Sequence, residues 1–209
     1  MSSTRLLLIC GILAAPLFIL TDLVAAVWLY PGYDYTAQQV SELSAIGAPS
    51  RDFWMLMSYP YFVLTVAFAI GLWRAAQGKR SLTITAALIG LFSVNSLLWG
   101  LVAPMHGRGT TFTDTDTMHI AFAVSAVALM LAFICFGAAS LGRSFRIYSA
   151  VTIVLILVAG GVAASQVPAI AANLPTPWMG LVERISVYGP TIWIAVLAIM
   201  LLPKTQPAK

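Results

Sequence analysis

The stretch LLLICGILAAPLFILTDLVAAVWL, residues 6–29, indicates the fold class. It is apolar apart from Thr21 and Asp22. It exceeds the ~20 residues with which an α-helix crosses the hydrocarbon core of a bilayer. Secretory signal peptides carry a shorter apolar region, of about 7–15 residues. We therefore expect a first membrane span that is retained rather than a cleaved leader.

Five more apolar segments follow, at residues 53–75, 82–103, 118–140, 147–167 and 182–202. None alternates polar and apolar residues as transmembrane β-strands do, and only helices or closed barrels satisfy backbone polar groups in lipid. The whole chain is 60% hydrophobic and 9% charged, whereas soluble domains carry about 25% charged residues. The sequence predicts an all-α, polytopic membrane protein, a bundle of six transmembrane helices that forms one domain over residues 1–209.

The basic residues predict the orientation of this bundle. Of the 11 Lys and Arg residues, only Arg51, Arg108 and Arg184 fall on one side of the alternating spans. Cytoplasmic loops carry the excess of Lys and Arg, so we expect a multi-pass protein of the cell membrane with both termini in the cytoplasm. The net charge of +4 then reflects topology and does not indicate a nucleic-acid partner.

The acidic residues and histidines gather on the opposite side from most of the basic ones. This predicted outer side holds all seven acids and both histidines: Asp22, Asp34, Glu42, Asp52, Asp114, Asp116, Glu183, His106 and His119. Acidic residues contribute little to the orientation rule, so topology alone does not explain the grouping. We expect the chemistry of the protein on its extracytoplasmic face.

The first outer connection carries a short amphipathic pattern. Apolar residues recur at every third position, at Ala37, Val40, Leu43 and Ile46, and Gly47 and Pro49 follow. This spacing places the apolar residues on one face of a short helix that Gly and Pro terminate. We expect an interfacial helix at the membrane surface. Its polar residues, Ser41, Glu42 and Ser44, would face water or the mouth of the bundle.

Tyr30-Pro-Gly-Tyr33 and Val40-Ser-Glu-Leu-Ser-Ala-Ile-Gly-Ala-Pro49 resemble a bacterial integral-membrane family catalogued as domain of unknown function 998. The resemblance extends more loosely through Asp116-Thr-Met-His119 and Gly180-Leu-Val-Glu-Arg184, and so covers nearly the whole chain. It implies a multi-span fold and an undetermined activity, and it assigns no catalytic residue.

Asp116 and His119 are three residues apart at a predicted helix start, so they share a face. The simpler interpretation is helix capping, with Asp114 or Thr115 as the cap, because acids are favoured in a first turn. The alternative is a zinc site with His106, Asp116 and His119 as three ligands beside an open position. No compact metal-binding motif supports this alternative.

Asp22 lies inside the first span, about 10 Å below its predicted end at ~1.5 Å per residue. An ionisable residue at such a depth needs a partner or a function. Arg184 or Arg51 is the expected partner in a structural ion pair. Glu183 neighbours Arg184, so the two side chains diverge on a helix, and one can face Asp22 while the other faces the outer connection.

The leading functional hypothesis is an extracytoplasmic polar pocket that binds a lipid headgroup or a small polar ligand. Its predicted walls are Ser41, Glu42, Ser44, Asp116, His119, Glu183 and Arg184. One alternative is a metal-dependent intramembrane hydrolase of lipid amides or esters, with Glu42 or Asp114 as base. A second is a proton-coupled transporter that uses Asp22, and a third is a structural partner protein.

Overall fold

The computed structural model describes residues 2–205, so Met1 and residues 206–209, including the basic Lys209 of the orientation argument, lie outside it. The described chain is helical and contains no strand. The long helices are α1 (Ser3–Val24), α2 (Arg51–Ala75), α3 (Arg80–Val102), α4 (Asp114–Ala138), α5 (Arg143–Ser165) and α7 (Met179–Leu201). Shorter elements are a π-helical turn that prolongs α1 (Ala25–Leu29), two 3-10 helices (Val40–Ser44 and Leu202–Thr205) and α6 (Val167–Ala171).

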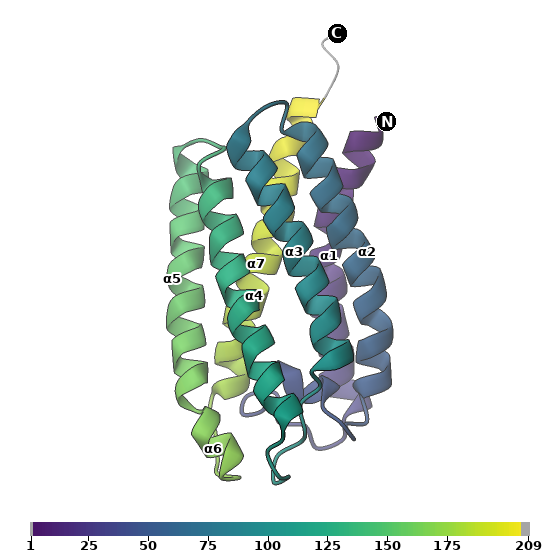
Figure 1. Cartoon of the computed structure of the whole chain (residues 1–209), viewed down its shortest axis with the longest axis vertical. Helices are drawn as coiled ribbons and strands as arrows, with labels where there is room; N and C mark the ends of the chain where they lie inside the picture. Colours follow the sequence, from purple (N-terminus) through teal and green to yellow (C-terminus); the bar gives the residue numbers. More distant parts are fainter. Residues whose placement is uncertain (1, 206–209) are drawn as a thin grey trace.

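Within residues 2–205, six helices are long and apolar enough to cross a membrane, which confirms the predicted fold class. Figure 1 shows the six running side by side, with the start of α1 and the end of α7 at the same end of the bundle. The connections at residues 30–50, 103–113 and 166–178 lie at the opposite end, which we call the loop end. An even number of spans requires this arrangement.

The helices begin two to four residues before the apolar segments that predicted them. Arg51, Arg80, Asp114 and Arg143 each occupy the first position of a helix. An apolar segment is counted only from the first residue after a charged one. The helix itself includes one more polar turn, because the side chains of that turn still reach water.

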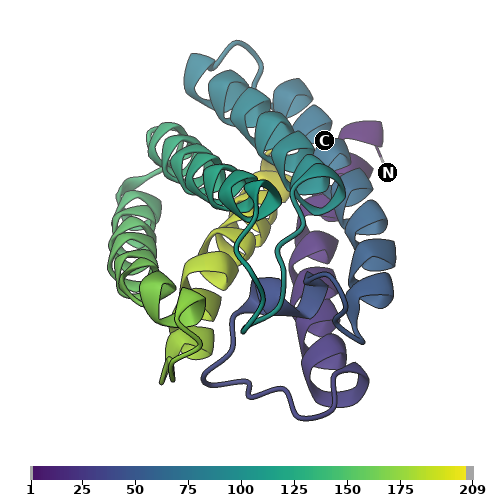
Figure 2. The same cartoon turned by 60° about the horizontal axis from the view of Figure 1, so that its bottom comes forward.

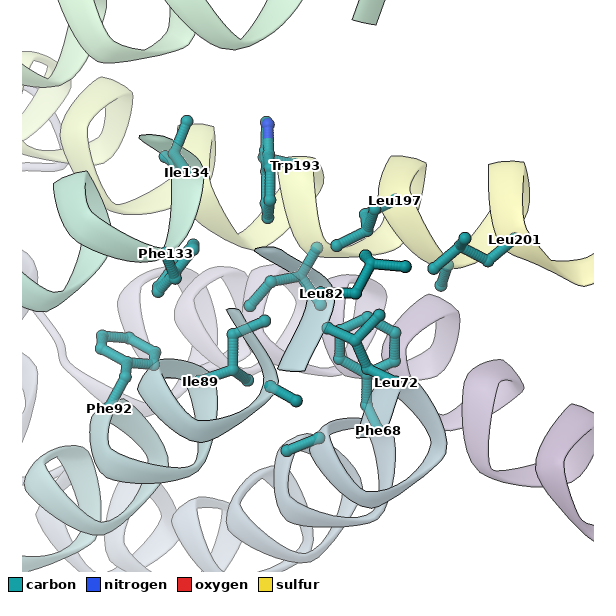
Figure 3. Close-up of a cluster of buried hydrophobic side chains, with 14 of the residues drawn as sticks. Phe68, Leu72, Leu82, Ile89, Phe92, Phe133, Ile134, Trp193, Leu197 and Leu201 are labelled. Carbon is teal, nitrogen blue, oxygen red and sulfur yellow. The ribbon is translucent and has the colours of Figure 1, made fainter. Parts of the chain in front are cut away.

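Helix α7 is the most enclosed of the six. Of the residues in the most apolar stretch of α7, 56% are buried, compared with 28–33% in the other spans. Figure 3 shows Trp193, Leu197 and Leu201 of α7 beside side chains of α2, α3 and α4. The indole nitrogen Nε1 of Trp193 donates to Ser149 Oγ at 2.9 Å, so this buried ring keeps its hydrogen bond. Residues at the loop end of α7 are therefore held on a rigid axis.

The first two loop-end connections are tied to each other and to α7. Ile46 N donates to Met105 O at 2.8 Å, and Gly180 N donates to Thr36 O at 2.8 Å. Figure 2, in which this end comes forward, shows the connections crossing the end of the bundle. The loop end is thus a folded cap.

The helix expected over residues 37–46 is shorter than predicted and is a 3-10 helix. Three residues per turn is the 3-10 repeat, which fits the spacing of the apolar positions. Ile46 lies beyond the helix and is 42% exposed, whereas Glu42 is 2% exposed. Of the two expected surroundings, water and the mouth of the bundle, water is therefore wrong for Glu42, because an arginine from another connection neutralises it inside the folded loop end.

Candidate functional site

Asp22 and Arg184 form the ion pair expected from the sequence, with Arg184 rather than Arg51 as the partner. Arg184 Nε lies 2.8 Å from Asp22 Oδ2, and Nη2 lies 2.9 Å from Oδ1. The exposed fractions of the two residues are 0% and 3%. The hydroxyl of Tyr188 also donates to Asp22 Oδ2, as does that of Tyr35 at 3.5 Å. Both carboxylate oxygens are therefore occupied, which does not favour Asp22 as the proton carrier of a transporter.

The same arginine fastens the first connection to α7. Its guanidinium lies 3.5 Å from the centroid of the Tyr35 ring, and Nη1 donates to Tyr35 O at 2.8 Å. Nη2 donates to the Tyr33 hydroxyl at 3.0 Å. Burial raises the pKa of Tyr33, which lies in the connection and keeps its proton to donate to the carbonyl of Gln38 or Gln39. We call Asp22, Arg184, Tyr33, Tyr35 and Tyr188 the ionic lock.

A second ion pair joins the first two connections. Arg108 Nη2 lies 2.8 Å from Glu42 Oε1, and Arg108 Nε lies 2.9 Å from Glu42 Oε2. Gln38 Nε2 donates to Glu42 Oε2 at 2.8 Å, and Gln39 N to Glu42 Oε1 at 2.9 Å. Sequence reasoning missed Arg108. A lone cation in a neighbouring connection was the available signal, but the distance between two connections is not encoded locally.

His106 and Asp116 lie together at the start of α4. Asp116 Oδ2 lies 3.0 Å from His106 Nδ1, and Oδ1 accepts from His106 N at 2.7 Å. Thr113 is the N-cap residue, and its N–H and hydroxyl donate to Asp116 Oδ2 at 2.8 and 2.7 Å. Asp116 thus completes a capping box. The expected cap at Asp114 or Thr115 is wrong, because the helix already begins at Asp114 and the N-cap position falls on Thr113 before it.

His119 does not join this pair. Its Nδ1 lies 2.8 Å from Trp99 Nε1 and 2.9 Å from Ala103 O. This nitrogen accepts a hydrogen bond from Trp99 in one tautomer of His119 and donates one to Ala103 O in the other. Within residues 2–205, no group of three or more His, Cys, Asp or Glu side chains is placed to hold a metal ion. The predicted zinc ligands His106, Asp116 and His119 are therefore not assembled. His106 and Asp116 are engaged at the N-cap of α4, and His119 contacts Trp99 and Ala103.

Two cavities meet at the loop end. The smaller, of about 150 Å³, lies among α1, α2, α3 and α7 beneath the Val40–Ser44 helix. The larger, of about 540 Å³, lies among α4, α5, α6 and α7 beneath residues 105–112. Six residues line both cavities: Ser41, Trp99, His119, Met130, Glu183 and Val187. The two spaces are therefore neighbours around α7 and α4.

The structure sorts the seven residues predicted to bind a ligand. Ser41, His119 and Glu183 line both cavities, Ser44 lines the smaller one and Asp116 the larger one. Glu42 and Arg184 are absent from both linings and are engaged in the two ion pairs. Trp99, which the sequence did not single out, stands between the cavities.

Glu183 has the least compensated carboxylate at this place. Its Oε2 accepts a hydrogen bond from Val40 N at 2.5 Å, so it faces the first connection as expected. In the described part of the chain, Arg108–Glu42 and Arg184–Asp22 are the ion pairs of arginine with acid, and His106 contacts Asp116; Glu183 has none of these partners. A half-buried acid without a cation partner thus lines both cavities.

No curated protein and no solved structure matches the chain. A family model described as protein of unknown function (DUF998) matches residues 12–200. The match covers nearly the whole chain, including every residue that lines the two cavities. This integral membrane protein therefore belongs to the DUF998 family.

Proposed function

We propose that this protein binds a membrane lipid at its loop end, with the polar headgroup in the smaller cavity, next to its junction with the larger one, and the acyl part in the larger cavity. The observation that carries the proposal is the pair of adjoining cavities that share Ser41, His119 and Glu183. Polar groups at one end and a long apolar wall at the other match the two halves of an amphiphile.

The sizes of the cavities support this division. Ordinary ligand pockets enclose about 300–1,000 Å³. The larger cavity, at about 540 Å³, lies in this range, and the smaller, at about 150 Å³, lies below it. The smaller space accommodates a headgroup, and the larger one accommodates a chain.

The wall of the larger cavity supports entry from the bilayer. Gly160 and Gly161 of α5 line this cavity, and a Cβ at either would meet nothing within 4 Å. Val124 of α4, which also lines it, is 65% exposed. An acyl chain can therefore pass sideways between α4 and α5 without crossing water.

The orientation that we propose places the loop end outside the cell membrane and both termini in the cytoplasm, by the distribution of Lys and Arg. The ligand would then come from the outer leaflet. A reporter fused near Pro49 should behave as external, and one fused after Lys79 as cytoplasmic. A cytoplasmic result at Pro49 would reverse the orientation.

Co-purified lipid tests the binding function. The wild-type protein should retain about one lipid per chain after purification in detergent, measured by native mass spectrometry. Gly160→Phe should fill part of the larger cavity with its ring and so exclude the lipid from it. Gly90→Phe is the matched control, since Gly90 also has open space beside it but lies in α3 and lines neither cavity. Equal lipid content in both variants would contradict the proposal.

Hydrolysis of the bound lipid is the second candidate function, and the His106–Asp116 pair favours it. Asp116 contacts His106 Nδ1, and in the described residues no hydrogen bond engages Nε2 of this histidine, which lines the larger cavity. A histidine oriented by a carboxylate can accept a proton from water that attacks an ester or amide carbonyl. His106→Gln should abolish lipid turnover, measured as released fatty acid, and leave lipid binding intact.

A further inference from the structure

Glu183 has no cation within ion-pair distance in the described residues. Asp22 and Glu42 lie against Arg184 and Arg108, respectively, and Asp116 accepts hydrogen bonds from His106 and Thr113. Asp34, Asp52 and Asp114 are exposed at the loop end. Glu183 alone among the acids of the described chain is both half-buried and without a cation partner. Because an uncompensated charge in a sheltered space is unfavourable, a cationic group in the cavity would stabilise it.

The walls of the smaller cavity suit a cation. Six aromatic side chains line it: Phe18, Trp54, Tyr61, Phe62, Phe92 and Trp99. Aromatic faces attract ammonium groups through the ring quadrupole, and quaternary ammonium ligands are commonly held in aromatic cages. Hydrophobic packing alone would favour aliphatic residues equally, so the combination with a carboxylate that has no ion-pair partner is the informative feature.

The hydroxyl groups of this cavity point to the same chemistry. Thr21, Ser93, Ser96 and Thr191 line it, and each donates its proton to a carbonyl of the preceding helical turn, at 2.7–2.9 Å. A hydroxyl has one donor and two acceptor lone pairs. With the proton engaged, each of these four groups turns its oxygen lone pairs toward an occupant, and their partial negative charge suits a cationic group.

An arginine also lines the smaller cavity and indicates that the ligand carries a negative group. Arg51 is the only Lys or Arg among its described lining residues. Its Nη1 donates to Ser44 O, and no hydrogen bond in the described structure engages Nε or Nη2. A guanidinium with two donor nitrogens that make no hydrogen bond to the protein is suited to bind a phosphate. The cavity therefore offers separate sites for a positive and a negative group.

We propose that the bound amphiphile is a zwitterionic phospholipid whose ammonium group lies against Glu183 and the aromatic wall and whose phosphate lies against Arg51. This inference rests on the proposed lipid-binding function and specifies the headgroup. A phospholipid with a glycerol headgroup supplies the phosphate but no cation for Glu183, and binds more weakly.

Competition between headgroups tests the inference. Short-chain phosphatidylethanolamine, phosphatidylcholine and phosphatidylglycerol with identical acyl chains are titrated into delipidated protein, and bound lipid is quantified by native mass spectrometry. The two zwitterionic lipids should bind about tenfold more tightly than phosphatidylglycerol, which corresponds to about 1.4 kcal/mol. Glu183→Gln should lower this ratio to near one, because Gln keeps an oxygen for Val40 N–H but removes the charge.

Asp52→Asn is the matched control, since Asp52 is an exposed acid that also lies at the loop end, in the first turn of α2, and lines neither cavity. It should keep the tenfold ratio. An unchanged ratio in Glu183→Gln, or equal binding of the three lipids to the wild type, would overturn the headgroup assignment and leave lipid binding in place. If the variant does not fold, the wild-type ratio still decides the matter. Failure of all three lipids to bind the wild type would overturn the proposed function and, with it, this inference.

Discussion

The ionic lock predicts a strong energetic coupling between Asp22 and Arg184. Asp22→Asn removes one charge at nearly constant volume, and Arg184→Met removes the other and keeps an apolar stem over the Tyr35 ring. Because the pair is 0% and 3% exposed, either change leaves an uncompensated charge in a poor dielectric. Breaking a buried pair in this way costs about 3–5 kcal/mol.

The double variant should lose much less than the sum of the two single losses. No buried charge remains, but Tyr35 O, Gly180 O and the Tyr33 hydroxyl lose their Arg184 donor. Leaving a buried acceptor without its donor costs about 1–3 kcal/mol, and the three costs at the lower end of that range sum to about 3 kcal/mol. The double variant should therefore fall short of additivity by at least about 2 kcal/mol.

The assay is reversible unfolding in mixed detergent micelles, followed by circular dichroism, on the wild type and the three variants. Asp52→Asn is the control, because substitutions of exposed residues shift stability by about 0.5 kcal/mol or less. Strictly additive losses for Asp22 and Arg184 would refute the reasoning. They would show that the two side chains do not interact energetically despite their bidentate geometry.

Three further predictions concern the loop end. Gly180→Ala should destabilise the fold by roughly 1–3 kcal/mol in the same unfolding assay, since a Cβ would lie 2.5 Å from Tyr35 O and closer still to another backbone oxygen. Arg108→Met should expose the connection at 103–113, because Glu42 would lose its cation, and hydrogen exchange there should accelerate. Hydrogen bonds from the hydroxyl and N–H of Thr36 and from the N–H of residue 37 lower the pKa of Asp34 below its ordinary value of 3.8. The turn is therefore stabilised above that value and weakens as the pH falls through the lowered pKa, which a carboxyl NMR titration measures.

Each of these has a control or an outcome that contradicts it. Gly161→Ala should leave stability nearly unchanged, because a Cβ there meets nothing within 4 Å, and an equal loss would show that the clash at Gly180 is not the cause. Unaltered exchange in Arg108→Met would mean that the ion pair does not hold the connection. A titration midpoint for Asp34 at or above 3.8 would contradict the turn geometry.

Local sequence determined the number of spans and the need to neutralise Asp22. A long apolar run must be a helix in lipid because its backbone has no other partner, and this holds whatever the neighbouring helices do. The divergence of Glu183 and Arg184 also follows locally, from about 100° of rotation per residue at 3.6 residues per turn. The sequence therefore indicated that one of them would face Asp22 and the other the first connection.

Tertiary structure alone decided which of two arginines meets Asp22, that Glu42 is buried against Arg108, and that His119 turns to Trp99 instead of joining His106 and Asp116. Helical periodicity places residues on a face, but not the rotation of one helix against another or the path of a connection across the bundle end. These depend on packing that involves the whole chain, so the cavities and the unpaired Glu183 between them emerge only when all six helices are in place.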